Sequence, residues 1–360
     1  MNRLQYIIGC VLIFCFVGAG TLQAQDTVSP KIDVKEIVFG HIGDAYEWHV
    51  TTWGDTEFVV PLPIIVRSNE TGWHFFLSSA FREGTSEGFY IAGEGKHKDK
   101  IVERKAATGE EVRPFDISIT KTALSLMINS LLVLCVILGV AHWYKDKTPS
   151  SAAPKGFVGA MEMFIAMIYD DVIKSCVGKD YKRYAPYLLT VFFFIFINNI
   201  MGLIPVFPGG ANVTGNIAIT LVLALCTFFA VNLFGSKEYW KEILWPDVPV
   251  WLKAPIPMMP VIELFGIFTK PFALMIRLFA NIMAGHSVIL GLTSLVFVTA
   301  SMGSAINGSM TVVSVLFGIF MNCLELLVAF IQAYVFTMLS AVFIGLSRPE
   351  ARKEKIEKTA

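Results

Sequence analysis

The sequence predicts an all-α polytopic membrane protein with five membrane-embedded helical segments, the last two forming a long tilted C-terminal hairpin, and a small β-rich extracytoplasmic head at the N-terminus. Hydrophobic residues make up 54% of the 360 residues and charged residues only 16%, with a mean hydropathy of +0.61. Soluble domains carry about a quarter charged residues, so this composition indicates a membrane protein. The formal net charge is zero, which argues against a nucleic-acid-binding protein, and the 29 Phe and 7 Trp exclude a disordered chain.

Residues 1–25 have the pattern of a secretory signal peptide. Arg3 supplies the positive charge, Tyr6–Gly18 the apolar core and Leu22–Ala24 the cleavage end. The alternative is an uncleaved transmembrane anchor, because Leu-Gln-Ala is only a fair match to the small-residue cleavage pattern. In both cases the following segment begins outside the cytoplasm.

Residues 26–120 form the predicted head, in which short β-type runs are separated by Gly, Asn and Ser turn residues. The runs are Glu57–Val60, Pro63–Val66, Trp73–Leu77 and Gly88–Ile91. The head contains no cysteine and therefore no disulfide. Its histidines, which are His41, His49, His74 and His97, lack the spacing of metal ligands. Surface or hydrogen-bonded histidines are therefore favoured over a zinc site, and no metal or cofactor is predicted.

The membrane domain is predicted at 121–347. Three segments carry no Asp, Glu, Lys or Arg, and each is long enough to span a bilayer: Thr122–Tyr144, Tyr184–Phe207 and Gly215–Gly235. Two longer apolar stretches follow, at about 264–299 and 310–347. A helix of ~35 residues reaches ~52 Å, against a hydrocarbon core of ~30 Å. We therefore expect strong tilt, with Gly285, Gly291 and Gly318 as candidate bend points.

Lysine and arginine concentrate in alternate connections, which sets the orientation by the positive-inside rule. They are Lys145, Lys147, Lys155, Lys174, Lys179, Lys182 and Arg183 after the first span, Lys237, Lys241 and Lys253 after the third, and Arg348, Arg352, Lys353, Lys355 and Lys358 in the tail. The connections 208–216 and 299–311 are uncharged. The head is thus predicted outside a bacterial inner membrane, and the basic tail at 348–360 in the cytoplasm.

Two further segments are predicted to lie at the membrane surface. The apolar residues of 157–172 fall on one helical stripe, which is typical of an interfacial amphipathic helix. Those residues are Phe157, Met161, Phe164, Ile165, Ile168 and Val172. The segment Tyr239–Lys253 contains three Trp and is typical of an aromatic interface belt.

Arg277 and Glu325 are the only formally charged residues in 271–347, where they are accompanied by His286. A charge at the bilayer centre costs about 2.5–3.5 kcal/mol on insertion scales, so such residues are functional candidates. The alternative is a structural Arg–Glu pair that only ties two helices together.

The register of an antiparallel hairpin tests this alternative. His286 and Glu325, and likewise Arg277 and Gln332, lie at nearly equal distances from residue 305 in the polar turn 302–307. We therefore expect His286 to face Glu325, and Arg277 to lie level with Gln332. Arg277 would then be offset from Glu325 by ~13 Å along the helix, which weakens the structural-pair interpretation.

The chemistry of these residues differs. Arginine keeps its charge at ordinary pH, so Arg277 without a carboxylate of its own chain predicts a carboxylate from another chain. His286 beside Glu325 can instead exchange protons near neutrality. Nine residues turn a helix by about 180°, so Arg277 and His286 point to opposite faces, and Asn281 shares the arginine face.

These residues resemble subunit a of rotary F-type ATP synthases. The resemblance rests on Arg277-Leu278-Phe279-Ala280-Asn281, Ala284-Gly285, Glu325 and Gln332, with Glu263, Lys270-Pro271, Asn198-Asn199 and Gly202-Leu203-Ile204-Pro205 upstream. It covers roughly 114–347. The exported head is longer than the usual N-terminus of this family, and the resemblance implies nothing about it.

The resemblance implies a membrane stator that holds two offset proton half-channels against a rotating ring of c subunits and is joined to peripheral-stalk b subunits. Arg277 would be the essential arginine between the half-channels, and Gln332 and Asn281 would line the site beside it. His286 and Glu325 would be the relay of the outer half-channel, with Glu and His exchanged relative to some bacterial members. Glu263 would lie toward the cytoplasmic exit.

Two alternatives belong to other classes. A self-contained secondary transporter would use Arg277 as an anion ligand, but it should show internal repeats and discontinuous helices, which the sequence lacks. An intramembrane hydrolase should show a motif such as H-E-x-x-H or a nucleophile with its base, and neither occurs in the spans. The sequence therefore predicts a proton-translocating subunit that is not itself an enzyme.

Overall fold

The structure is a computed structural model that describes residues 43–53, 56–104, 110–145, 147, 154–204, 207–244 and 258–348. Several predicted features lie outside the described residues. They are the signal at 1–25, His41, Pro205, the part of the aromatic segment Tyr239–Lys253 that follows Leu244, and the tail after Arg348.

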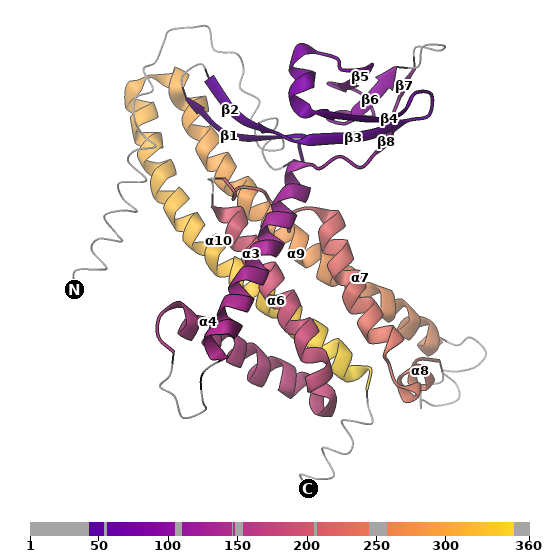
Figure 1. The fold of residues 1–360 in the computed structure, drawn as a ribbon. Helices are drawn as coiled ribbons and strands as arrows, with labels where there is room; N and C mark the ends of the chain where they lie inside the picture. The colour runs from indigo at the N-terminus through magenta and orange to yellow at the C-terminus, as the bar shows by residue number, and fades with distance from the viewer. Residues whose placement is uncertain are drawn as a thin grey trace.

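The described chain is mostly helical, with a strand-containing head at one end of the helices (Figure 1). The main helices are α3 (Lys121–Tyr144), α4 (Phe157–Ala166), α6 (Tyr181–Leu203), α7 (Ile217–Leu233), α8 (Lys237–Leu244), α9 (Met258–Thr299) and α10 (Ser304–Leu346). Among the described residues four helical segments are long and apolar enough to cross a membrane, or five if α7 and α8, which are bent by 97°, form one broken span. A polytopic helical membrane protein is thereby confirmed.

The head contains three small antiparallel sheets, ordered β1-β2, β4-β3-β8 and β5-β6-β7. The strands are β1 (Glu47–Trp53), β2 (Thr56–Pro61), β3 (Pro63–Ser68), β4 (Gly72–Leu77), β5 (Phe89–Ile91), β6 (Ile101–Arg104), β7 (Glu111–Val112) and β8 (Phe115–Asp116). The four predicted runs fall in or overlap β2 to β5. Strands alternate their side chains between two faces, so Ile64 and Val66 of β3 are buried with Phe89 and Ile101, while Arg67 is exposed.

Hydrogen bonds attach the head to the start of α3. The backbone N–H of Lys121 donates to the carbonyl of Ala45 over 2.8 Å, and that of Thr122 donates to the Asp44 carboxylate over 3.0 Å. A carboxylate at a helix N-terminus is favourable because it meets unpaired N–H groups and the positive end of the helix dipole. Tyr46 donates to Asp116, and burial together with this bond raises the pKa of the Tyr46 phenol. The head is therefore fixed to the first membrane helix.

Helix α6 lies at the centre of the membrane domain and packs against α3 and α10. Its side chains Leu188, Phe192 and Ile195 are fully buried. Two adjacent asparagines tie it to its neighbours: Asn198 accepts from Asn129 of α3 over 3.0 Å, and Asn199 donates to the carbonyl of Ala329 in α10 over 3.2 Å. Such hydrogen bonds are available between membrane helices because no water competes for the amides.

The long helices differ from the predicted spans at their ends. Helix α6 stops at Leu203 instead of Phe207, since Pro205 follows and residues before a proline disfavour the helical conformation. Helices α9 and α10 both begin earlier than predicted. Because α10 begins at Ser304, the turn between the two helices shrinks to a short 3₁₀ segment at Ala300–Met302 and Gly303, which has φ 101°. Both helices continue without interruption through the glycines proposed as bend points.

The amphipathic segment 157–172 is helical, as α4 followed by a π-helix at Met167–Lys174. Met161, Ile168 and Val172 of its stripe are buried in the core cluster that surrounds α6, whereas Phe157 is exposed. Much of the apolar stripe therefore packs on protein, and its interfacial position remains a prediction.

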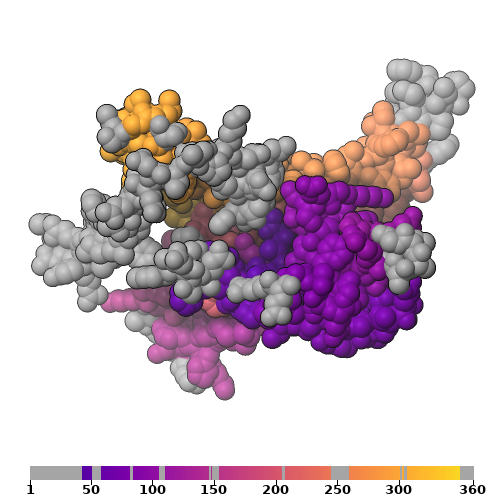
Figure 2. Space-filling model, turned by 90° about the horizontal axis from the view of Figure 1, so that it is seen from above, coloured from indigo at the N-terminus to yellow at the C-terminus, as the bar shows by residue number. Residues whose placement is uncertain are grey.

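The head and the turn between α9 and α10 lie at the same end of the helices, and the last residues of α10 lie at the opposite end (Figure 1). Seen from above, the head in indigo to purple covers one side of the helices, with the orange end of the hairpin beside it (Figure 2). At the far end, Arg348 forms an ion pair with Asp180 over 2.8 Å and fixes the end of α10.

Gly345 tests this packing, because a Cβ added there would lie 2.1 Å from the carbonyl oxygen of Cys176. Backbone cannot move aside cheaply, so we expect Gly345→Ala to separate α10 from its neighbour and lower the midpoint of thermal unfolding of the detergent-solubilised protein by several degrees. Gly318→Ala is the matched control on the same helix, because nothing lies within 4 Å of its added Cβ. Equal melting of the two variants would contradict this packing.

Candidate functional site in the helical hairpin

His286 of α9 and Glu325 of α10 meet inside the hairpin, as the predicted register requires. His286 Nδ1 lies 2.9 Å from Glu325 Oε1, and the side chains are 16% and 4% exposed. The two residues come from positions nearly equidistant from the turn, which is why an antiparallel packing of α9 on α10 brings them level. The contact confirms the register of the hairpin.

Glu325 is buried with few partners. Neither carboxylate oxygen makes an aligned hydrogen bond within the described residues, so the 2.9 Å approach of the imidazole is a close ionic contact without hydrogen-bond alignment. An unpaired buried carboxylate is costly, and either a bound proton or a charged imidazole beside it removes most of that cost. Within the described residues, the imidazole of His286 is therefore the ionic contact that Glu325 makes.

Gly285 provides the space for this contact. A Cβ at Gly285 would lie 2.8 Å from Glu325 Oε1 and 3.1 Å from its Cδ. Any larger residue would push the carboxylate out of its position beside His286. The absence of a side chain at this position is thus a requirement of the pair, and α9 passes through it as an unbroken helix.

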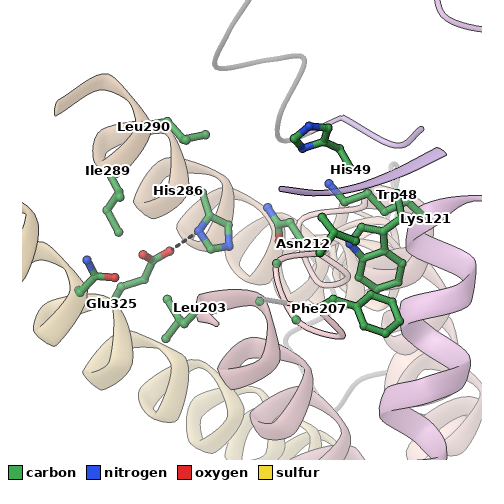
Figure 3. A pocket seen from close by; sticks show the side chains of 15 residues that line it. Trp48, His49, Lys121, Leu203, Phe207, Asn212, His286, Ile289, Leu290 and Glu325 are labelled. Atoms are coloured by element: carbon green, nitrogen blue, oxygen red, sulfur yellow. Dashed lines mark ion pairs between the residues drawn. The ribbon is translucent and has the colours of Figure 1, made fainter. Parts of the chain in front are cut away.

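A cavity of about 350 Å³ opens beside the pair (Figure 3). Four parts of the chain line it: the hairpin of α9 and α10, the end of α6, the connection after α6, and the head together with the start of α3. The lining includes His286, Ile289, Leu290, Asn322, Glu325, Gly202, Leu203, Phe207, Asn212, Trp48, His49, Val50 and Lys121. Both members of the pair are therefore among the residues that line one cavity.

Arg277 lies on a different face of the hairpin. It is exposed, and no carboxylate within the described part of the chain forms an ion pair with it. It lines a second, more open cavity of about 290 Å³ with Lys270, Leu339 and Phe343. Nine residues separate it from His286, or ~13 Å along α9. The structure therefore keeps the arginine apart from Glu325.

The other predicted site residues are not gathered around Arg277. Asn281 is exposed one turn further along the arginine face, whereas Gln332 is only 6% exposed in the interior. No hydrogen bond joins either of them to Arg277 within the described residues. Glu263 is half-buried fourteen residues before Arg277, which places it ~21 Å along α9, toward the end away from the head.

The surroundings of Arg277 are apolar and open. Large side chains exposed on α9 and α10 include Phe265, Phe268, Phe272, Ile276, Leu316, Phe320, Leu327 and Ile331. Exposed apolar area of this extent marks a surface that meets lipid or another protein. Arg277 thus projects from a largely apolar surface.

Sequence reasoning missed several residues of the first cavity. Asn212 lies in the connection after α6, accepts a hydrogen bond from the Gly215 N–H over 2.8 Å and has an Nδ2 that is buried without a partner in the described residues. Trp48 and Lys121 come from the head and the start of α3. Lys121 and Asn212 are polar residues beside the ends of predicted spans, whereas nothing in the sequence connects Trp48 with the cavity.

Within the described residues, no group of three or more His, Cys, Asp or Glu side chains is arranged to hold a metal ion. His74 instead pairs with Glu87 and bonds Thr71, and the cysteines Cys135, Cys176, Cys226 and Cys323 are free. Among the described residues of 271–347, the acidic, basic and histidine side chains of the hairpin are His286 and Glu325, which are in contact, and Arg277 on another face.

A protein-family model described as "ATP synthase A chain" matches residues 125–345, which include the whole hairpin site. The chain belongs to the ATP synthase A chain family. Membership implies a place in proton translocation in the membrane sector, with the ATP chemistry residing in other subunits. A second model, described as "Domain of unknown function (DUF8433)", matches residues 37–118 and so covers the head.

Curated relatives agree with this family. The chain is 47% identical over 239 residues to ATP synthase subunit a of Chlorobium phaeobacteroides (strain DSM 266), covering 65% of this chain and 66% of that protein. It is 42% identical over 243 residues to ATP synthase subunit a of Chloroherpeton thalassium, covering 66% and 68%. The match to ATP synthase subunit a of Myxococcus xanthus is 40% over 240 residues, covering 64% and 73%. The chain thus spans about two thirds of the length of its first relatives.

Gly285→Val tests the contact inside the hairpin. The added side chain would displace the Glu325 carboxylate, which is the flexible end of its residue, so the fold should survive. We expect ATP-driven proton pumping by membranes containing the variant to fall several-fold at an unchanged amount of the subunit.

Gly291→Val is the matched control on α9, because an added Cβ at Gly291 meets nothing within 4 Å. Equal pumping by the two variants would show that the position of the Glu325 carboxylate does not matter.

Proposed function

We propose that the chain is the stator subunit of the membrane sector of a rotary ATP synthase, providing two offset proton half-channels to a ring of c subunits with Arg277 between them. It couples proton flow to ATP synthesis while other subunits carry out the ATP chemistry. The observation that carries this proposal is Arg277, an exposed arginine on an apolar face with no ion-pair partner among the described residues.

The reason is electrostatic. A guanidinium at the bilayer centre costs about 2.5–3.5 kcal/mol on insertion scales, and a carboxylate from a neighbouring chain would offset that cost. A buried carboxylate on a ring subunit supplies such a partner each time the ring turns. Because arginine stays protonated, Arg277 would attract the ionised ring carboxylate without passing a proton across.

The two cavities support two separate paths. The first cavity reaches His286 and Glu325 from the head side, and would be the outer half-channel with this pair as its relay. The second lies beside Arg277 and Lys270, nearer the opposite end, and would open toward the inner half-channel with Glu263 at its exit. Gln332 and Asn281 would line the ring-facing site beside Arg277 once the ring is in place. Protons could then move from one path to the other only by travelling on the ring.

The orientation follows from the charges and the fold together. The head and the hairpin turn share one end, and the last residues of α10 lie at the other (Figure 1). With lysine and arginine enriched at the C-terminal end, we propose that the protein lies in a bacterial inner membrane with its head outside and its tail in the cytoplasm. The proposal also includes a cleaved signal at 1–25, a head at 26–120, a membrane domain at 121–347, a tail at 348–360 and contact with peripheral-stalk b subunits.

Replacing Arg277 tests the proposed function. We expect Arg277→Ala to abolish ATP-driven proton pumping in inverted membrane vesicles while the complex still assembles, because the ring carboxylate loses its counter-charge. Arg277→Lys should also fail largely, since lysine lacks the planar fork and can lose its proton. Pumping is measured by quenching of a pH-sensitive dye and assembly by co-purification of the other subunits.

Lys174→Ala is the control, because this lysine forms only an exposed ion pair with Asp170, over 3.6 Å, and its loss should leave pumping near normal. Near-normal pumping by Arg277→Ala would overturn the assignment. If pumping persists and the purified chain alone carries anions across vesicles, the transporter alternative would be favoured.

The relay makes a separate prediction. His286→Glu and Glu325→His should each slow pumping strongly, because each leaves two like groups in one buried site. The double variant should recover a substantial part of the activity, since it restores one imidazole and one carboxylate. A double variant as slow as the single ones, in complexes assembled to the same level, would argue against a relay.

A further inference from the structure

The cavity that reaches His286 has an outer wall made by the head. Trp48, His49 and Val50 of β1 line it, together with Lys121 at the start of α3. In Figure 3, Trp48, His49 and Lys121 lie across the cavity from His286 and Glu325, with Asn212 between the two groups. The family match begins at residue 125, after all four of these residues, so the wall lies outside the part of the chain that the family model matches.

The wall is held firmly in place. Trp48 is 2% exposed, and its ring packs edge-on against Phe207, with the ring centroids 5.0 Å apart. Phe207 belongs to the connection after α6 that also supplies Asn212. The Ala45 and Asp44 contacts to the first residues of α3 fix the same segment from the other side. The position of β1 over the cavity is therefore a packed contact between the head and the membrane domain.

The lining is suited to water. His49 is exposed at the rim, and the amide of Asn212 and the pair His286–Glu325 follow inward. Asn212 therefore places a polar side chain in the lining, although its Nδ2 is itself buried and makes no hydrogen bond to the described residues. Two glycines also line the cavity: a Cβ at Gly202 would make an ordinary contact with His286 Nε2 at 3.6 Å, and Gly210 adopts φ 78°, a conformation that favours glycine.

We propose that the β-rich head forms the outer entrance of the proton path, so that protons pass between β1 and the connection after α6 before they reach His286. The head is then a working part of the half-channel in addition to any bracing role. This inference rests on the proposed function, because it assigns the entrance of the same path. It also gives a role to the segment at 37–118, whose matching family has no known function.

A thiol-blocking experiment tests the entrance. Val50→Cys is introduced into a chain whose own cysteines are replaced by alanine, and the purified complex is treated with a bulky, charged methanethiosulfonate reagent and reconstituted into vesicles. We expect ATP-driven proton pumping to fall several-fold after labelling and to return when a reductant removes the label. Methylthiolation of the same cysteine, which adds only a small group, should leave most of the pumping.

The matched control is Glu94→Cys, at an exposed position of the head that does not line the cavity. Its labelling with the bulky reagent should have no effect on pumping. His49→Cys serves as a second cavity position if Val50→Cys reduces assembly, and labelling there should also lower pumping. Mass spectrometry reports the extent of labelling in each case.

The outcomes separate this inference from the proposed function. Two results would overturn the proposal that the head forms the entrance. One is unchanged pumping when Val50→Cys and His49→Cys are fully labelled. The other is failure of both cysteines to react while Glu94→Cys reacts. Loss of pumping on labelling supports the proposal. The proposed function fails separately, if unlabelled complexes pump equally well with and without Arg277.

Discussion

The cost of placing a charge in hydrocarbon governs the arrangement of α9 and α10. A charged residue near the bilayer centre costs a few kcal/mol, and these two helices carry one cation and one anion in the region 271–347. They do not neutralise each other: Glu325 is buried beside His286, while Arg277 is exposed on another face. The separation of the two charges implies that each is retained for a purpose other than mutual pairing.

Other polar side chains in the hairpin satisfy themselves locally. Ser287, Thr293 and Ser294 donate to backbone carbonyls four residues earlier in α9, and Asn322 does the same in α10. Hydrogen bonds of this kind remove the cost of a polar group in a membrane helix. Glu325 and Arg277 make no such local bond within the described residues. The rest of the domain packs on the hairpin from one side, through α6 with its Asn199 and through α7, and Arg277 stays exposed on another face.

The sequence predicted the parts of the site that depend on periodicity. The spans, and the pairing of His286 with Glu325, follow from hydropathy and from the constant register of an antiparallel hairpin. The role of Gly285 did not follow, because a close approach of two helices depends on tertiary packing that a glycine alone does not reveal. The apolar stripe at 157–172 was assigned to the membrane surface, although Ile168 and Val172 are buried in protein. Periodicity indicates which face is covered but not what covers it.

The head illustrates the same limit. Strand β1 was not predicted, and its residues lie apart in sequence from the cavity they line. The packing of Trp48 on Phe207 and the hydrogen bonds from the start of α3 to Asp44 and Ala45 bring the two together.

The central claim is that Arg277 faces a carboxylate of another chain. An electron cryomicroscopy structure of the purified complex, at a resolution that shows side chains, tests it most directly. We expect a ring of small helical subunits to cover the open face of α9 and α10, with a buried ring carboxylate in direct or water-bridged contact with the Arg277 guanidinium. A complex in which Arg277 faces lipid, or pairs with a carboxylate of its own chain, would contradict it.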